Sequence, residues 1–168
     1  MKKTGLIFLF SLISSLIALP AMAAPQTIAN YRDWVVYRQD LNGDTVCYVV
    51  TEPTEKLPSA VNHGNVFFLV STWKSGVAKN QPSLMTGYAL RDAPEPTIRI
   101  GSDKWDMFIS ETEGFIDDTS DEERLIAAMR RGSDMRISAV SERGTATNYT
   151  FSLIGVSDAL ERASRECR

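Results

Sequence analysis

Few residues in this chain of 168 have the chemistry of a catalytic or metal-binding site. His63 is the only histidine, which excludes any metal site that needs two imidazole ligands. It could still act as a general base. However, His63 lies in the turn-like run Asn62-His63-Gly64, and the sequence has no G-x-S-x-G motif for a nucleophilic serine. We therefore predict that His63 is a surface-loop residue rather than a catalytic one.

Two groups of carboxylates could bind a cation. Asp40, Asn42 and Asp44 occupy the first, third and fifth positions of a calcium-loop pattern. The pattern then fails, because Thr45 stands where glycine is needed and Thr51 where the bidentate glutamate belongs. A hairpin turn explains the same residues.

The second acidic group lies between positions 117 and 123. Its members are Asp117, Asp118, Asp121, Glu122 and Glu123. Carboxylates at a helix start complement the helix dipole, which accounts for them without a metal. We predict no catalytic residue, no metal site and no cofactor.

The charge balance limits the classes of partner. The chain has 18 basic and 21 acidic residues. Without Lys2 and Lys3, which lie in a predicted leader, 16 basic and 21 acidic residues remain, a net charge of −5. A mildly acidic protein without a basic tract is a poor binder of nucleic acid and of anionic lipid.

The first 23 residues have the three zones of a secretory signal. Lys2 and Lys3 precede an apolar run from position 6 to 19, and Ala21-Met22-Ala23 supplies small residues for cleavage after Ala23. The apolar run is shorter than the ~20 residues that span a bilayer, and no second run of that length follows. We predict a cleaved signal peptide over 1–23, a mature domain over 24–168 with no transmembrane segment, and a periplasmic or secreted location.

Cys47 and Cys167 are the only cysteines. In an oxidising compartment they allow one intramolecular disulfide, and the alternative is two free, buried thiols. Closing so long a loop would stabilise the fold by roughly 4–5 kcal/mol in the chain-entropy model. In a predicted C-terminal helix, Leu160, Ala163 and Cys167 fall on one face, which turns the thiol toward the core.

Short segments rich in aromatic and β-branched residues alternate with turns that contain glycine, proline or asparagine. We predict strands at 31–37, 46–51, 66–73, 84–90, 97–100, 104–109, 115–116, 135–139 and 149–153, with residues 24–30 as a mobile leader and 52–65 as a loop. The apolar run at 66–73 indicates a strand covered on both faces. A capping box from Ser120 to Glu123 begins one helix, and Ser157 is the expected N-cap of a second. The pattern predicts a mainly β protein, an antiparallel β-sandwich with two short helices in a single domain.

Trp34, Trp73 and Trp105 each lie in or beside a predicted strand. Large aromatic residues in such positions usually belong to the core. If two of them were exposed together, they would make a face that binds sugar or protein.

Several short motifs occur in a fixed order along the mature chain. They are Trp34-Val35-Val36, Cys47-Tyr48-Val49, Thr97-Ile98-Arg99-Ile100, the helical segment 125–132, and the segment 151–160 closed by Cys167-Arg168. In this order they resemble the invasion-associated locus B family of exported bacterial proteins. The resemblance implies a secreted or envelope-associated β-sandwich linked to host-cell invasion, with no catalytic residue and no cofactor.

The resemblance also bears on the cysteines. Cys47 and Cys167 match two cysteine positions of the family, which favours their pairing. Another family cysteine pair has no counterpart, because the sequence there reads Gly114-Phe115-Ile116.

Three hypotheses for function follow. The first is a non-enzymatic exported protein that binds an unknown protein or envelope component. The second is a periplasmic binder of a small molecule or glycan that uses an exposed Trp or Tyr face. The third is an unrecognised hydrolase that uses His63 with a nearby serine or carboxylate.

Overall fold

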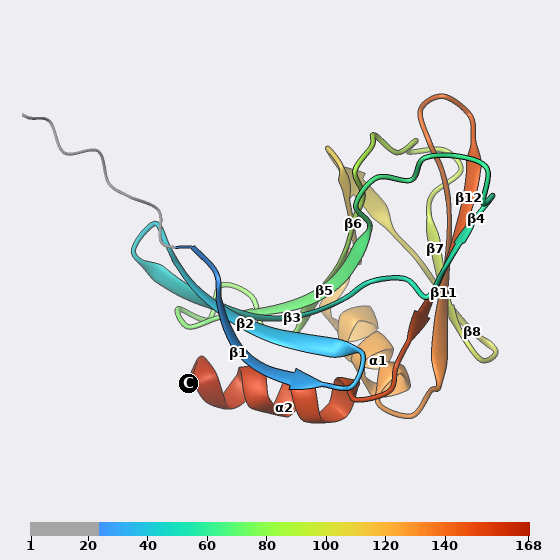
Figure 1. Cartoon of the computed structure of the whole chain (residues 1–168). Helices are drawn as coiled ribbons and strands as arrows, with labels where there is room; N and C mark the ends of the chain where they lie inside the picture. Colours follow the sequence, from blue (N-terminus) through green and yellow to red (C-terminus); the bar gives the residue numbers. More distant parts are fainter. Residues whose placement is uncertain (1–23) are drawn as a thin grey trace, which may run out of the picture.

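Residues 24–168, the part of the chain that the computed structural model describes, form two antiparallel sheets (Figure 1). The predicted signal peptide over 1–23 lies outside the described residues. Sheet A has, in spatial order, β1 (Gln26–Tyr31), β2 (Trp34–Leu41), β3 (Asp44–Thr51), β5 (Phe67–Trp73), β6 (Gln81–Met85), β10 (Glu113–Phe115) and β9 (Phe108–Ser110). Sheet B has β4 (Glu55–Leu57), β12 (Ala146–Ser152), β11 (Asp134–Val140), β7 (Thr97–Ile100) and β8 (Asp103–Asp106).

Two helices complete the fold, α1 (Thr119–Met129) and α2 (Val156–Glu166). α2 packs against β1, β2 and β3 with its buried residues Ala159, Leu160 and Ala163. In Figure 1 it lies beneath these strands. The predicted class is confirmed: the protein is mainly β, with two antiparallel sheets and two helices.

The core lies between the sheets and under the helices. Phe68 of β5 meets Phe151 of β12 with ring centroids 5.9 Å apart. Trp34 is fully buried, and its indole N–H donates to the carbonyl of Ser152 at 3.1 Å. This bond satisfies the polar end of a large apolar side chain where the two sheets meet.

Residues 24–30 are not a mobile leader. Gln26–Tyr31 forms β1, which pairs with β2 through an irregularity between Thr27 and Ala29. Ile28, Ala29 and Tyr31 pack against the core. The prediction was wrong because this segment pairs with the next strand and also packs against α2, at the far end of the chain, which local pattern does not reveal.

Three further strand predictions were wrong. The single strand predicted at 104–109 is divided between β8 in sheet B and β9 in sheet A. The predicted loop 52–65 contains β4, which pairs with β12. The strand predicted at 84–90 instead occupies Gln81–Met85. After β6 the chain passes so close to its own backbone that a Cβ on Gly87 would lie 3.0 Å from the Asn65 nitrogen.

Both helices begin at residues other than those predicted. The N-cap of α1 is Asp118, whose carboxylate accepts the backbone N–H of Ser120 at 2.7 Å. Hydrogen bonds from the Ser120 hydroxyl and backbone hold the pKa of Asp118 below its usual value. The N-cap of α2 is Gly155, at φ 95°, and a Cβ there would lie 2.1 Å from the Tyr31 carbonyl oxygen. Only glycine, which has no Cβ, fits where the chain passes the Tyr31 carbonyl, so this tertiary contact determines where α2 begins.

Candidate functional site

His63 is buried, with 7% of its surface exposed, so the predicted surface-loop histidine was wrong. Its Nε2 lies 2.9 Å from the Pro58 carbonyl oxygen, and its Nδ1 lies 3.0 Å from the Tyr149 hydroxyl. A carbonyl only accepts, so Nε2 carries the hydrogen and, in the neutral ring, Nδ1 accepts from Tyr149. The imidazole therefore ties the 58–64 loop to β12.

Tyr149, which is fully buried, joins His63 to a second tyrosine. Its hydroxyl meets that of Tyr88, which in turn lies 3.0 Å from the Thr147 hydroxyl. Burial, together with the hydrogen bond to Tyr88, raises the pKa of Tyr149 far above its usual value of 10.0. The phenol stays protonated and satisfies its neighbours, which is a structural role.

A pocket of about 620 Å³ lies beside this cluster, lined by His63, Tyr88 and Ser141 among others. The Ser141 hydroxyl oxygen accepts the Thr145 N–H at 3.1 Å. Within residues 24–168, the hydrogen-bond partners of the His63 ring are Tyr149 and Pro58. The His63 ring is therefore not hydrogen-bonded to a serine or a carboxylate, the pairing that the hydrolase hypothesis names.

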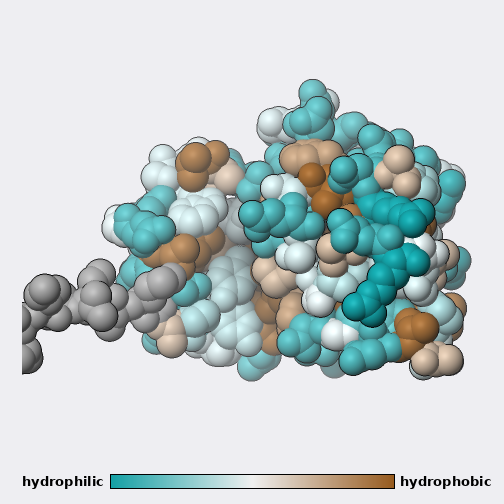
Figure 2. Space-filling view, turned by 90° about the horizontal axis from the view of Figure 1, so that it is seen from above, coloured by the Kyte–Doolittle hydropathy of each residue, from teal (hydrophilic) through white to brown (hydrophobic). Residues whose placement is uncertain are grey.

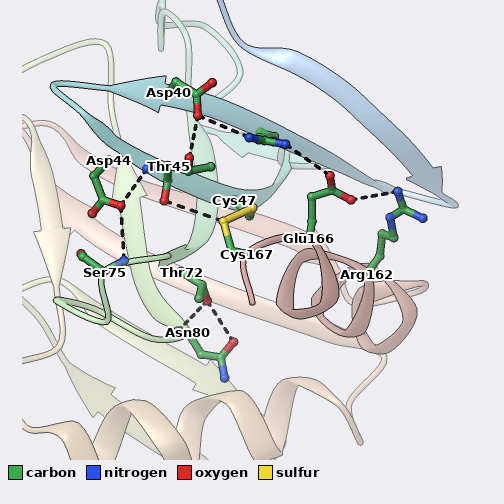
Figure 3. Close-up of a disulfide and its surroundings, with 11 residues drawn as sticks. Asp40, Asp44, Thr45, Cys47, Thr72, Ser75, Asn80, Arg162, Glu166 and Cys167 are labelled. Atoms are coloured by element: carbon green, nitrogen blue, oxygen red, sulfur yellow. Dashed lines mark hydrogen bonds and ion pairs between the residues drawn. A yellow bond between two sulfur atoms is a disulfide. The ribbon is translucent and has the colours of Figure 1, made fainter.

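The disulfide joins Cys47 of β3 to Cys167 at the end of α2, with Cα atoms 5.8 Å apart (Figure 3). The helical spacing places the Cys167 side chain on the buried face, as predicted. Nearby, Glu166 lies 3.0 Å from Arg162 and 3.8 Å from Arg38. These contacts fasten the C-terminal helix to β2 and β3, on the core side of sheet A.

The carboxylates of the calcium-like pattern stabilise the turn between β2 and β3 instead (Figure 3). Asp40 accepts the Thr45 hydroxyl at 2.6 Å, and this hydrogen bond lowers the Asp40 pKa. Asp44 accepts the backbone N–H groups of Thr45 and Ser75, at 2.7 and 3.3 Å. Hydrogen bonding to Ser75 lowers the pKa of Asp44. Within the described residues, no group of three or more His, Cys, Asp or Glu residues could hold a metal.

The three tryptophans differ in exposure. Trp34 and Trp105 are buried, and the Arg124 guanidinium lies 4.3 Å above the Trp105 ring. Trp73, at the end of β5, is only partly buried. It lies on the side of sheet A that faces away from the core.

That side of sheet A carries a line of mostly apolar residues, which we name the apolar row. Antiparallel partners share one face of a sheet, so the strand registers place its members side by side across six strands. The members are Val35, Val50, Leu69, Ser83, Phe115 and Phe108. Five of the six are apolar; Phe108 is 44% exposed, while Val35, Val50, Leu69 and Phe115 are partly exposed.

A second row lies beside it, made of Tyr37, Tyr48, Ser71 and Gln81, and we name it the tyrosine row. All four residues are partly exposed. The Tyr37 and Tyr48 rings stack with centroids 5.3 Å apart and planes at 19°. Each ring therefore covers one face of the other.

On its other side the apolar row is flanked by the acidic row. The strand registers place Phe67, Met85, Glu113 and Ser110 in this row. Asp33 and Glu52, which line a pocket of about 360 Å³ with Phe67, complete it. Val35, Tyr37 and Val50 line the same pocket, which therefore opens on the same face. Burial, with the nearby Glu111, raises the Glu113 pKa above its usual value.

Figure 1 shows sheet A curving away from α2, with this face on the upper side. Figure 2 looks down on that side and shows a hollowed surface on which pale and brown side chains gather among teal ones. We name this surface, made of the three rows, the open face.

The outer face of sheet B has the opposite composition. Its central row, the polar row, runs through Lys104, Arg99, Arg136, Thr150 and Glu55. Ser138 and Asn148 lie on the same face and hydrogen-bond at 2.6 Å. A polar outer face of this kind is usual for an antiparallel sheet whose other face packs against the core.

Sequence reasoning missed the open face. The strand at 66–73 was expected to be covered on both faces, yet in β5 only Phe68 and Val70 are buried, while Phe67 and Leu69 are partly exposed. The available signal was the excess of apolar residues at alternate positions of β2, β3 and β5. It shows that both faces are apolar and leaves open which one is covered.

A family model for the invasion associated locus B (IalB) protein matches residues 34–164. This chain belongs to the IalB family. The matched region includes both sheets from β2 onward and most of α2. The IalB resemblance seen in the sequence is therefore confirmed.

The crystal structure of invasion associated protein B from Bartonella henselae is similar to this IalB-family chain, with a TM-score of 0.54 and 16% sequence identity. The alignment covers 85% of this chain and 96% of that one. At this identity the likeness concerns the fold. No curated protein sequence matches the chain. No helix within residues 24–168 is long and apolar enough to cross a membrane.

Proposed function

We propose that this IalB-family protein is an exported, non-enzymatic protein that binds a partner protein of the envelope or of a host cell through the open face of sheet A. The observation that carries the proposal is the apolar row, which crosses six strands on the side of sheet A away from the core and whose five apolar members are all at least partly exposed. At its far end Phe108 lines a pocket of about 680 Å³ with residues of α1 such as Ile126. Contiguous exposed apolar surface of this kind marks an interaction site.

The composition of the open face supports protein recognition. Aromatic residues and Met are enriched at protein interfaces, whereas Lys is depleted there. The three rows contain Phe, Tyr and Met residues and no Lys. The partly exposed Trp73 lies at the margin of the same face.

A glycan or small-molecule ligand is less well supported. Sugars stack on an exposed aromatic plane, but Tyr37 and Tyr48 stack on each other. Because each ring covers one face of the other, less aromatic plane is left for a sugar, and partly exposed tyrosines of this kind suit contacts with protein side chains.

Export is supported by two features. Residues 1–23 have the order of a secretory signal. The Cys47–Cys167 disulfide belongs in an oxidising compartment outside the cytoplasm.

Site-specific photo-crosslinking in the producing bacterium tests the proposal. A crosslinking amino acid at Leu69, in the apolar row, should give a discrete adduct that the same amino acid at Thr150, in the polar row, does not. Phe108→Asp, at the exposed edge of the open face, should abolish the Leu69 adduct. Equal labelling from both positions, or none from Leu69 under any growth condition, would contradict the proposal.

A further inference from the structure

The open face has a definite pattern of charge and shape, from which the chemistry of its occupant can be inferred. Asp33, Glu52 and Glu113 all lie on one side of the apolar row. On the other side lie Tyr37, Tyr48, Ser71 and Gln81, which carry no formal charge at neutral pH. Of the two rows beside the apolar row, one therefore carries carboxylates and the other carries no charge. Beyond the tyrosine row, Gln81 lines a pocket with charged residues of both signs, among them Glu122 and Arg130.

The length of the apolar row is set by the strand spacing. Six strands have five gaps of about 4.8 Å, so the row is about 24 Å long. An α-helix of roughly 16 residues has the same length. A single line of apolar side chains also matches the apolar stripe of an amphipathic helix.

Backbone hydrogen bonding favours a helix over an extended segment. A strand laid across the face of a sheet would bury N–H and C=O groups without partners, whereas a helix satisfies its own. This sheet already accepts a helix on its other side, where α2 packs against β1, β2 and β3.

We propose that the open face binds an amphipathic helix of a partner protein, with an apolar stripe along the apolar row and Lys or Arg residues along the acidic flank. The proposal rests on the proposed function and specifies the partner's chemistry. Basic residues on the partner complement the three carboxylates, and such complementarity sets orientation and rate of association.

Other occupants match the face less well. A second copy of this chain, open face to open face, would set the acidic row against either the other acidic row or the tyrosine row, and neither has a basic residue to complement it. The polar row of sheet B is basic but has no apolar stripe to match the apolar row. An anionic membrane surface would be repelled by the acidic flank.

The test uses the protein purified after export, with its disulfide intact, and three synthetic peptides of about 18 residues, long enough to span the apolar row. One has leucines on a helical stripe and lysines along one flank. The second has glutamate in place of each lysine, and the third is a scramble of the first. Fluorescence anisotropy measures binding.

We expect the lysine peptide to bind at least about ten-fold more tightly than the glutamate peptide, because several charge pairs act together. The scrambled peptide should not bind. Glu52→Gln combined with Glu113→Gln should bring the lysine and glutamate peptides closer in affinity. Leu69→Asp should abolish binding, and Phe108→Asp provides a second disruption at an exposed position. Thr150→Asp is the matched control and should change nothing.

The outcomes separate the inference from the proposed function. If the Leu69 crosslink forms in cells but the lysine and glutamate peptides bind equally, or neither binds, the helix inference is wrong and the proposed function stands. If the crosslink is absent, the proposed function fails. If Thr150→Asp weakens the lysine peptide as much as Leu69→Asp does, binding is not at the open face.

Discussion

The outer faces of the two sheets meet the same solvent with opposite side chains. Across sheet A the apolar row places Val35, Val50 and Leu69 next to one another, with Phe115 and Phe108 further along. Across sheet B the corresponding line is the polar row of Lys104, Arg99, Arg136, Thr150 and Glu55. Both rows arise from antiparallel strand pairing, yet only the row on sheet A is apolar. The fold itself therefore does not require an apolar outer face.

The inner faces make the comparison sharper. Each sheet has a buried apolar face, with Phe68 and Val70 in sheet A and Tyr149 and Phe151 in sheet B. Sheet B therefore stabilises the fold with one apolar face, and its other face is free to be polar. Sheet A carries a second apolar face that the core does not use, which is the physical reason to assign that face to recognition.

The largest expected effect is a loss of stability that leaves binding at the open face unchanged. Replacing Cys47→Ala and Cys167→Ala together should lower the free energy of unfolding by up to about 5 kcal/mol, because the loop closed by the disulfide is long. Chemical denaturation measures this change. Below the unfolding transition, binding at the open face should persist, since Cys47 points to the core side. Loss of binding by a folded double variant would contradict the division between the two faces.

A pair of adjacent residues in β5 tests whether the open face is uncovered. Phe68→Ala removes a fully buried side chain and should cost about 3–5 kcal/mol. Leu69→Ala, on the open face, should cost less than about 1 kcal/mol. Urea unfolding of both variants gives the comparison. Similar costs would mean that the apolar row is covered in the isolated protein.

The matching pair in β12 tests the two faces of sheet B. Tyr149→Phe removes the hydroxyl that joins His63 to Tyr88 and should cost about 1–2 kcal/mol, because buried polar groups lose a partner. Thr150→Val, in the polar row, should stay within about 0.5 kcal/mol of the parent protein. If Thr150→Val were the more costly change, the polar row would have a larger part in stability than its exposure indicates.

The smallest expected effect is a change in thermal stability with pH, caused by Glu113 of the acidic row. Burial raises the Glu113 pKa in the folded protein above 4.5. The folded protein therefore holds the Glu113 proton more tightly than the unfolded chain does. The free energy of unfolding falls as pH rises from about 4.5 through the raised pKa. Glu113→Gln should slightly raise the unfolding midpoint at neutral pH and leave it unchanged well below pH 4.5, as thermal unfolding across pH would measure. A lower midpoint at neutral pH would mean that the ionised carboxylate has a stabilising partner.

Local pattern predicted the β class, the two helices and the hairpin of β11 and β12. In that hairpin Met135, Ile137 and Ala139 alternate with polar residues, so each residue indicates its own face. The pattern failed where a distant neighbour decides the structure. β1 packs against α2, at the far end of the chain, as well as pairing with β2, and α2 begins at Gly155 because the Tyr31 carbonyl passes there.

The sequence by itself determined that this is a β protein with turns at Asn42 and Gly144, and that it has few residues suited to catalysis. It also allowed only one intramolecular disulfide, and the family resemblance favoured its formation. Tertiary structure alone decided that His63 is buried, and that residues as distant as Val35 and Phe115 form one row. Alternation along a strand tells which residues share a face, whereas covering that face depends on helices and sheets far away in the chain. The open face is therefore visible only once α2 and sheet B are seen to cover the other side.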